Sequence, residues 1–396
     1  MRKQSLTADE QKLFNDYFTQ YLFKQFESPT PTPTSIPFAR KELLIFLKQG
    51  KSGPVYNQLL KMTVERMKRL AGPTAHPAAR VNAVLVLGEL SDQEPDGKPL
   101  KEVFPLLLFV VGSPKFPDAA KVAGLTGLER FAKEDAVPAD KKAALTGQML
   151  AILNQADPPA GRSDDGHEWI RRCAAQVLAA LGSPGPKGEV LAAYEAVIRD
   201  PASPATLRNE VAECLGRLKY PPGAKLDYAS VANLLGHQTV EICQREIGKA
   251  DSDELNPARR MIVYTLFSVL HGLEGTDSRS GLLAAAAGSP NQKEIEALRS
   301  KIKTTYTTAE DADLSGTDFH KAIEDMIAEL QSALPPKPEL KADTVAEKPA
   351  APAATAPAAA AAPGTAPAAA APVAAAPATP DAARADARRA ATGGGN

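Results

Sequence analysis

A short pattern recurs five times along this chain, and it constrains the fold more than any other feature of the sequence. A basic residue is followed by a small or apolar residue three positions on, and by apolar residues seven and ten positions on. Residues with these offsets share one side of an α-helix. The clearest copy, "ARVNAVLVLGEL" at 79–90, is apolar or small on almost every side. The pattern therefore predicts helices that neighbours cover over a wide arc.

A second helical segment lies between consecutive copies, as in "KGEVLAAYEAVIR" at 187–199, and proline or glycine breaks separate the two. The repeating unit is therefore a pair of helices with a period of about 40–50 residues. We predict structural roles for the basic residue that starts each copy, for the leucine seven positions on, and for the small residue of the first copy. These positions are Arg80, Ala83, Leu87, Lys121, Leu128, Arg171, Leu178, Arg208, Leu215, Arg259 and Leu266.

Two copies, "ARVNAVLVLGEL" and "LRNEVAECLGRL", resemble the second helix of a HEAT repeat, which carries a valine or arginine, an alanine and a leucine–glycine pair. The resemblance is to uncharacterised bacterial HEAT-repeat domain proteins, and it covers about residues 50–275. It implies an α-solenoid with a ladder of arginines that bonds carbonyls or carboxylates of the adjacent repeat. HEAT proteins are mostly scaffolds, and none of their shared residues is catalytic. The alternative role for the arginines is a basic row that grips an acidic partner, which requires exposed guanidinium groups.

The expected fold is all-α, a HEAT-like α-solenoid of about five to six helix pairs. It follows an aromatic N-terminal capping helix at 1–27 and a Pro/Thr linker at 28–37. The solenoid is expected at 38–275, further helices at 276–334, and a disordered Ala/Pro-rich tail at 335–396. Between 349 and 380 the tail is nearly all alanine and proline, with proline every few residues and no apolar side chain larger than Val373.

The N-terminal helix is expected to begin with a capping box, because Thr7 is followed three residues on by Glu10. We expect its aromatic residues to cover the end of the solenoid and to face the segment at 55–70. These residues are Phe14, Phe18, Tyr21 and Phe26. The alternative is a docking helix that inserts into a groove of a partner.

The densest group of potential metal ligands is "DDGHEW", which contains Asp164, Asp165, His167 and Glu168. It is not a zinc-binding HExxH motif, because Arg171 stands where the second histidine belongs. Acidic residues just before a helix also cap its N–H groups, and we predict that role. "DADLSG" at 311–316 opens like a calcium-binding loop but has Ala322 in place of the bidentate glutamate. We therefore predict no catalytic residue, no cofactor-binding residue, no metal site and no cofactor.

The sequence predicts a non-enzymatic scaffold that binds a protein partner on the concave face of the solenoid. The 46 Lys+Arg and 47 Asp+Glu residues balance, which argues against a nucleic-acid partner. No apolar run is long enough to span a membrane, and we expect a monomer in the cytoplasm. Two alternatives remain open. One is a ligand-binding or enzymatic protein that uses Asp164–Glu168, and the other is an envelope-associated structural protein with a spacer tail, exported if a signal peptide lies upstream.

Overall fold

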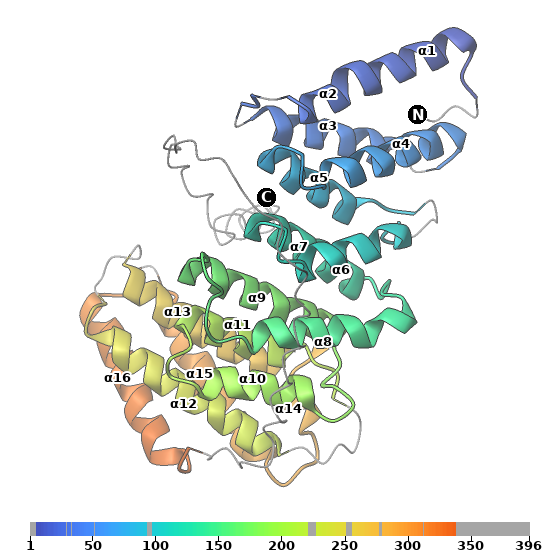
Figure 1. Ribbon diagram of the computed structural model, residues 1–396. Coiled ribbons are helices and arrows are strands. Elements are labelled where there is room, and N and C mark those ends of the chain that lie inside the picture. Colours follow the sequence, from blue (N-terminus) through green and yellow to red (C-terminus); the bar gives the residue numbers. More distant parts are fainter. Residues whose placement is uncertain are drawn as a thin grey trace, which may run out of the picture. The chain divides into compact units, whose positions relative to one another are not determined.

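The structure is a computed structural model that describes residues 5–28, 30–32, 34–50, 52–92, 97–220, 227–250, 256–276, 279–311 and 313–337. The chain divides into two units, Met1–Thr344 and Val345–Asn396. The prediction of an all-α fold is confirmed for the described residues (Figure 1). Their only strands form a hairpin of two residues each, β1 (Gly275–Thr276) and β2 (Arg279–Ser280). The predicted disordered tail lies outside the described residues beyond position 337.

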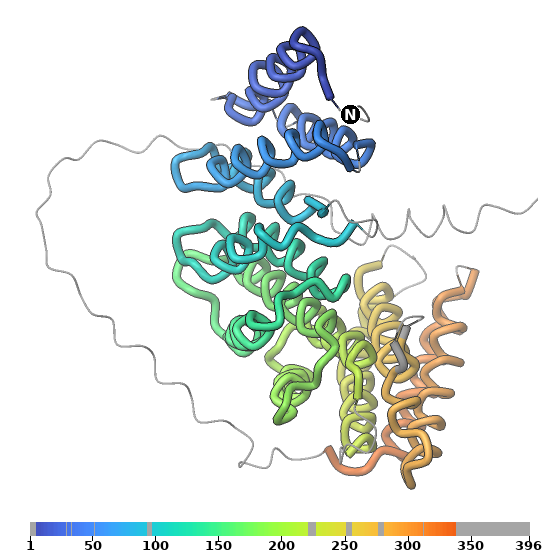
Figure 2. The backbone as a smooth tube through the Cα atoms, turned by 90° about the vertical axis from the view of Figure 1, so that its right-hand side faces the viewer, coloured from blue at the N-terminus to red at the C-terminus, as the bar shows by residue number. Residues whose placement is uncertain are grey.

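Five helix pairs follow one another between residues 54 and 274 of the described chain. Each first helix packs against the second helix that follows it, and the second helices also pack on one another in chain order (Figure 2). The first helices are α4 (Pro54–Leu70), α6 (Phe104–Gly112), α8 (Lys142–Leu153), α10 (Glu189–Arg199) and α12 (Tyr228–Ile247). The second helices are α5 (Pro77–Glu89), α7 (Asp118–Lys133), α9 (Asp164–Leu181), α11 (Ala205–Leu215) and α13 (Pro257–Glu274). Single 3-10 turns, η2 (Lys101–Val103) and η3 (Ala139–Lys141), precede α6 and α8.

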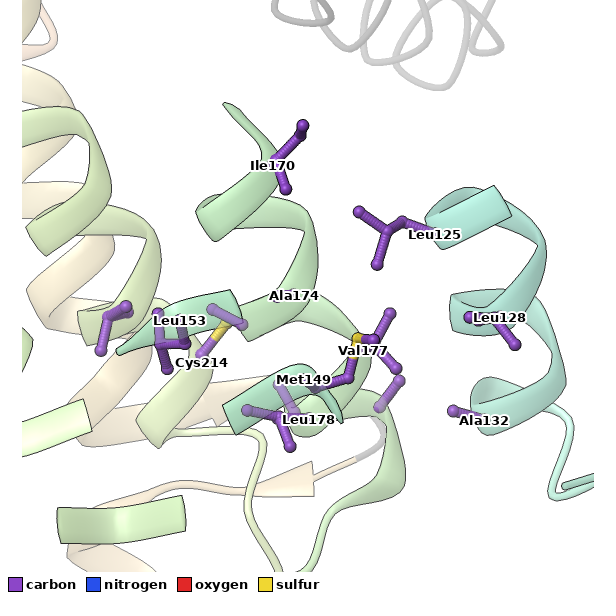
Figure 3. Close-up of a cluster of buried hydrophobic side chains, with 14 of the residues drawn as sticks. Leu125, Leu128, Ala132, Met149, Leu153, Ile170, Ala174, Val177, Leu178 and Cys214 are labelled. Carbon is purple, nitrogen blue, oxygen red and sulfur yellow. The ribbon is translucent and has the colours of Figure 1, made fainter. Parts of the chain in front are cut away.

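The five copies of the sequence pattern fall on the five second helices. Their leucines at Leu87, Leu128, Leu178, Leu215 and Leu266 are at most 1% exposed, and Ala83 is fully buried. Figure 3 shows buried side chains at the α7–α9 contact, where Leu128 of α7 and Leu178 of α9 belong to one apolar cluster. The second helices therefore form a continuous packed row, and the HEAT identity of the repeat stays a prediction.

Glycines set the closest approach between second helices at two places. A Cβ on Gly88 of α5 would lie 2.9 Å from the Cα of Gly127 on α7. A Cβ on Gly216, just after α11, would lie 2.1 Å from the carbonyl oxygen of His271 and 3.0 Å from the Cα of Gly272. Real Cβ atoms are not found this close to backbone, so these two contacts exist only because the side chains are absent.

Three arginines of the pattern bond the helix that precedes them. The Nε of Arg171 donates to the Leu153 carbonyl at 2.9 Å, and the Nε of Arg208 donates to the Ile198 carbonyl at 2.9 Å. Arg80 donates to carbonyls in the turn after α4, the nearest being that of Pro73 at 2.6 Å. Arg208 also donates to the Glu241 carboxylate on α12, in the next helix pair, at 2.7 Å, which agrees with the expected bond to the adjacent repeat. The carbonyl contacts, in contrast, lie within one helix pair. The reason is that the end of a helix leaves carbonyls unbonded and favours a cation.

The other two basic residues of the pattern behave differently. Arg259 donates to the Asp311 carbonyl at 3.0 Å, and its guanidinium carbon lies 4.7 Å from the ring centroid of Phe319. Lys121 is half-buried, and burial together with the charge of Arg162 lowers its pKa. The guanidinium-bearing side chains of Arg171, Arg208 and Arg259 are 6%, 2% and 3% exposed. Because these three arginines are buried, they do not form the exposed basic row that binding of an acidic partner would require.

The N-terminal segment is helical from residue 8 to 26, through α1 (Ala8–Asp16), the π-helix η1 (Tyr17–Leu22) and α2 (Phe23–Phe26). The predicted capping box of Thr7 and Glu10 is present. The backbone bonds of a π-helix reach five residues back, which widens the turn, and Phe18, Leu22 and Phe26 are buried. Tyr21 is consequently turned outward and 53% exposed, so its predicted contact with the body is wrong.

The N-terminal helices pack on α3 (Ser35–Gly50), rather than mainly on the segment at 55–70. Contacts with α4 are a hydrogen bond from Gln58 to Asn15 and an ion pair between Arg66 and Glu27. The predicted linker at 28–37 is shorter than expected. The reason is that Thr32 accepts a bond from the Ser35 amide at 3.2 Å, so the helix starts there.

The C-terminal helices of the body continue both rows. The short α14 (Leu282–Ala285) leads to α15 (Gln292–Ala309), which packs on α13, and α16 (Gly316–Ala333) packs on α12. The start of the predicted tail at 335 is wrong by a few residues. His237 donates to the Pro335 carbonyl at 2.8 Å, and the Lys337 ammonium lies 2.6 Å from Glu241, so this segment is held against α12.

Candidate functional site

The predicted group at Asp164–Glu168 forms the first turn of α9. The Ser163 hydroxyl caps this helix by accepting from the Gly166 amide at 3.2 Å, and Asp164 and Asp165 are exposed in its first turn. Two carboxylates near a helix N-terminus are stabilised by its dipole. Among the described residues, no three His, Cys, Asp or Glu side chains come close enough to hold a metal ion.

The other two members of this group point into the body and bind different partners. His167 is 3% exposed; its Nδ1 accepts from Arg162 at 3.1 Å, so its Nε2 donates to the Gln155 carbonyl at 2.7 Å. Glu168 accepts a bond from Thr206 on α11. The four residues therefore do not converge on one point.

Arg162 explains why His167 is held so firmly. Its Nε and NH2 donate to the two carboxylate oxygens of Asp118 at 3.0 and 2.9 Å, a bidentate pair that joins the start of α7 to the loop before α9. This arrangement ties two successive helix pairs together, and it is a structural contact.

The calcium-like loop at 311–316 also serves as a helix start. Ser315 caps α16 by accepting from the Asp318 amide at 3.1 Å, and Asp311 accepts from the Asp313 amide at 3.0 Å. These carboxylate and hydroxyl oxygens bond the backbone in place of a cation.

A different group of polar side chains lies between α9 and α11, and the sequence analysis missed it. The two carboxylate oxygens of Glu210 accept separately from α9, one from Arg172 at 3.1 Å and the other from Gln176 at 2.7 Å. Glu210 is 1% exposed, whereas the Arg172 side chain is 24% exposed. We call these three residues the Glu210 cluster. A buried carboxylate with both oxygens satisfied fixes the position of the partly exposed guanidinium.

Two neighbours extend the Glu210 cluster along the second-helix row. Burial and the charge of Glu210 raise the pKa of Tyr264 on α13 above its usual range. Burial, with the charges of Glu129 and Glu210, raises the pKa of Cys173 on α9 to about 12. Both groups therefore stay protonated near neutral pH.

The chain's only tryptophan, Trp169, stands beside this cluster and is 41% exposed. Trp169, Arg172 and Gln176 are spaced three and four residues apart, so they share one face of α9. One helix thus presents an exposed indole next to a guanidinium that its neighbour α11 holds in place.

A second ion pair links more distant helices on the same row. Glu129 of α7 pairs with Lys133 at 2.8 Å and lies 3.8 Å from Arg217, which follows α11. These contacts are longer or more exposed than those of Glu210, so they contribute less to a fixed geometry.

A signal for the cluster was present in the sequence. In the α5 copy, Asn82 stands two residues after the arginine of the pattern, and in the α11 copy Glu210 stands there. A charged residue in a helix that neighbours cover over a wide arc needs a partner. That partner, Arg172, comes from another repeat, and spacing along the chain does not identify it.

Comparison with known proteins adds no family. No protein-family model, no curated protein and no solved structure matches this chain. Across the part of the chain that the structure describes, no helix combines the length and apolarity needed to cross a membrane.

Proposed function

We propose that the protein is a non-enzymatic scaffold that binds a protein partner on the side of the second-helix row that carries Trp169. The observation that carries this proposal is the exposed Trp169 beside the Glu210 cluster. Tryptophan and arginine contribute most to protein interfaces, and here Trp169 and Arg172 share one face of α9.

The way in which Arg172 is held supports binding at this place. An arginine that is already fixed by a buried carboxylate loses little side-chain freedom when a partner arrives. Its side chain is 24% exposed, so a partner that bonds the exposed part of the guanidinium adds to the contact already made by Glu210. The cluster thus provides a preorganised polar anchor next to an aromatic one.

The chemistry of the potential nucleophiles supports a non-enzymatic role. Burial raises the pKa of the Cys173 and Cys243 thiols to about 12, and a protonated thiol is a poor nucleophile. Both ring nitrogens of His167 are engaged, Nδ1 by Arg162 and Nε2 by the Gln155 carbonyl, so neither is left to act as a general base.

Site-specific crosslinking tests the proposal. A photoreactive amino acid at position 169 should crosslink a partner protein in cells, whereas the same group at Phe109 should not. Phe109 is a matched control because it is 57% exposed but lies on α6, in the row of first helices. Trp169→Ala should abolish capture of that partner without changing the melting temperature. Equal crosslinking at both positions would contradict the proposed face.

A further inference from the structure

The N-terminal helices carry most of the large apolar side chains that the described chain leaves in solvent. Four of the six such residues belong to α1, η1 and α3: Leu13 is 71% exposed, Phe38 60%, Tyr21 53% and Ile45 44%. Scattered single apolar residues are normal on a protein surface, but a concentration at one end of the body is not. This end therefore has an apolar face that the rest of the body does not cover.

The arrangement on α3 is regular. Phe38, Lys41, Ile45 and Lys48 are all exposed and are spaced three, four and three residues apart. These spacings put them in one stripe along the helix, in which an apolar and a cationic side chain alternate. We call these four residues the α3 stripe.

Tyr17 connects the α3 stripe to the helices before it. Its hydroxyl donates to Glu42 at 2.6 Å, and its ring lies 5.4 Å from Tyr21 and 5.7 Å from Phe46. Burial and the bond to Glu42 raise the pKa of Tyr17 to about 12, so the hydroxyl keeps its proton. The one carboxylate of α3, Glu42, is half-buried beneath this bond, whereas Lys41 and Lys48 are exposed, so the exposed charges of the stripe are those of the lysines.

We propose that this face docks on the surface of an anionic lipid bilayer. Alternating lysines and apolar side chains are typical of helices that lie in the membrane interface, where the cations meet lipid phosphates and the apolar groups enter the boundary of the acyl chains. Tyrosine is favoured at the same depth. The apolar side chains of the stripe, Phe38 and Ile45, are 60% and 44% exposed and project outward, so they suit insertion into lipid better than a partner that needs a recessed groove.

This binding is peripheral and independent of the proposed partner site on α9. The stripe lies on α3, whereas Trp169 lies on α9, and the second helices α5 and α7 stand between them. A membrane-bound N-terminal end leaves the Trp169 face available to a partner. The two sites together make a protein that recruits its partner to a membrane surface.

Vesicle flotation of the full chain tests the proposal directly. The chain should float with vesicles of phosphatidylcholine mixed with phosphatidylglycerol, should remain unbound with phosphatidylcholine alone, and should be released by added salt. Lys41→Gln with Lys48→Gln should weaken binding to the anionic vesicles about thirtyfold, because each lysine near such a surface contributes about a fivefold gain.

The apolar contribution has its own variant and control. Phe38→Ser with Ile45→Ser should weaken binding at least about tenfold, because the two side chains no longer enter the bilayer. Phe109→Ser removes an equally exposed phenylalanine from α6 and should leave binding unchanged. Since all the substituted residues are exposed, the variants should have the melting temperature of the wild type. If a serine variant melts at a lower temperature, Phe38→Gln, which changes the side-chain volume less, is used in its place.

Three results would overturn the proposal. One is equal binding to neutral and anionic vesicles, and another is a loss with Phe109→Ser as large as that with the α3 variants. The third is a chain that binds no vesicles but dimerises through the α3 stripe, as light scattering of the wild type and the Phe38→Ser variant would reveal. Because Trp169→Ala leaves the stripe intact, vesicle binding by that variant separates failure here from failure of the partner site.

Discussion

The helices α5 and α11 carry the same sequence pattern but connect to the rest of the molecule differently. Near its start each has an arginine that bonds carbonyls, those of the turn after α4 for Arg80 and that of Ile198 in α10 for Arg208. Each also ends close to a glycine that meets a glycine of the next second helix. They differ at the two positions after the arginine. Val81 and Asn82 stand there in α5, and Asn209 and Glu210 in α11.

The difference changes what the helix is bonded to. In α5, the Asn82 side chain donates to the Ala78 carbonyl of its own helix at 2.9 Å. In α11, Asn209 donates to Thr265 on α13 at 2.9 Å and accepts from Gln238 on α12 at 2.8 Å, while Glu210 binds α9. The pattern positions therefore set how the helices pack, and the positions between them set which helices are joined by polar bonds.

The largest effect should be shared by the two helices. Leu87→Ala and Leu215→Ala should each lower the free energy of unfolding by about 2–5 kcal/mol, because both side chains are fully buried between helices. The midpoint of urea unfolding measures this. If only one of the two variants lost stability, the pattern would not have the same structural role in both helices. Exposed Phe109→Ala is the control and should have little effect on the midpoint.

The next effect should separate the two helices. Glu210→Gln should cost about 2–3 kcal/mol, because it leaves the Arg172 charge partly buried without its carboxylate; the solvent exposure of Arg172 keeps the cost below that of a fully buried pair. Asn82→Ala removes only a bond to its own helix and should change stability by less than about 0.5 kcal/mol. Thermal unfolding measures the stability of the two variants. Equal losses of stability would refute the distinction between polar bonds to another helix and polar bonds within one helix.

Features that depend on residues close together in the chain were accessible from the sequence. The leucines of the second helices follow from periodicity, because burial at every third or fourth position is a local property of an amphipathic helix. The capping box of Thr7 follows from two residues three positions apart. Both features depend on residues close together in the chain.

Contacts between pairs were not accessible in the same way. The Glu210 cluster joins residues 38 and 34 positions apart, and the glycine contact of Gly216 depends on which face of α13 it meets. The exposed Tyr21 depends on a π-helical turn whose extra width shifts the register. One sequence gives no direct reading of register between helices that are far apart in the chain.

The two glycine contacts should differ in how much they tolerate a methyl group. Gly216→Ala should cost about 1–3 kcal/mol, because the new Cβ meets a backbone oxygen that cannot move without shifting α13. Gly88→Ala should cost about 1 kcal/mol, because its Cβ would meet the Cα of Gly127 at 2.9 Å and a small shift relieves it. Urea unfolding of both variants provides the comparison. A more severe loss for Gly88→Ala would mean that α5 and α7 are held more rigidly than α11 and α13.

The smallest effect concerns the arginines that begin the two helices. Arg80 bonds three carbonyls, whereas Arg208 also donates to the Glu241 carboxylate at 2.7 Å. Burial opposes the Glu241 charge, but bonds from Lys337 and Arg208 prevail and lower its pKa below the usual 4.5. A lowered pKa in the folded state stabilises the fold above about pH 4.5, and this contribution disappears as the pH falls through the folded-state pKa.

Glu241→Gln should therefore cost about 0.5–1 kcal/mol near pH 7, a modest amount because the Glu241 side chain is 34% exposed. The difference from wild type should shrink toward zero as the pH falls below about 4.5, because both proteins then lack the charge. Unfolding free energies measured over this pH range test the sign. Glu102→Gln is the control, since that carboxylate is 55% exposed and 3.5 Å from Lys68, and it should change little at any pH. A deficit for Glu241→Gln that stays constant into acid would show that the side chain acts by packing, and that α5 and α11 hold their first arginines in the same way.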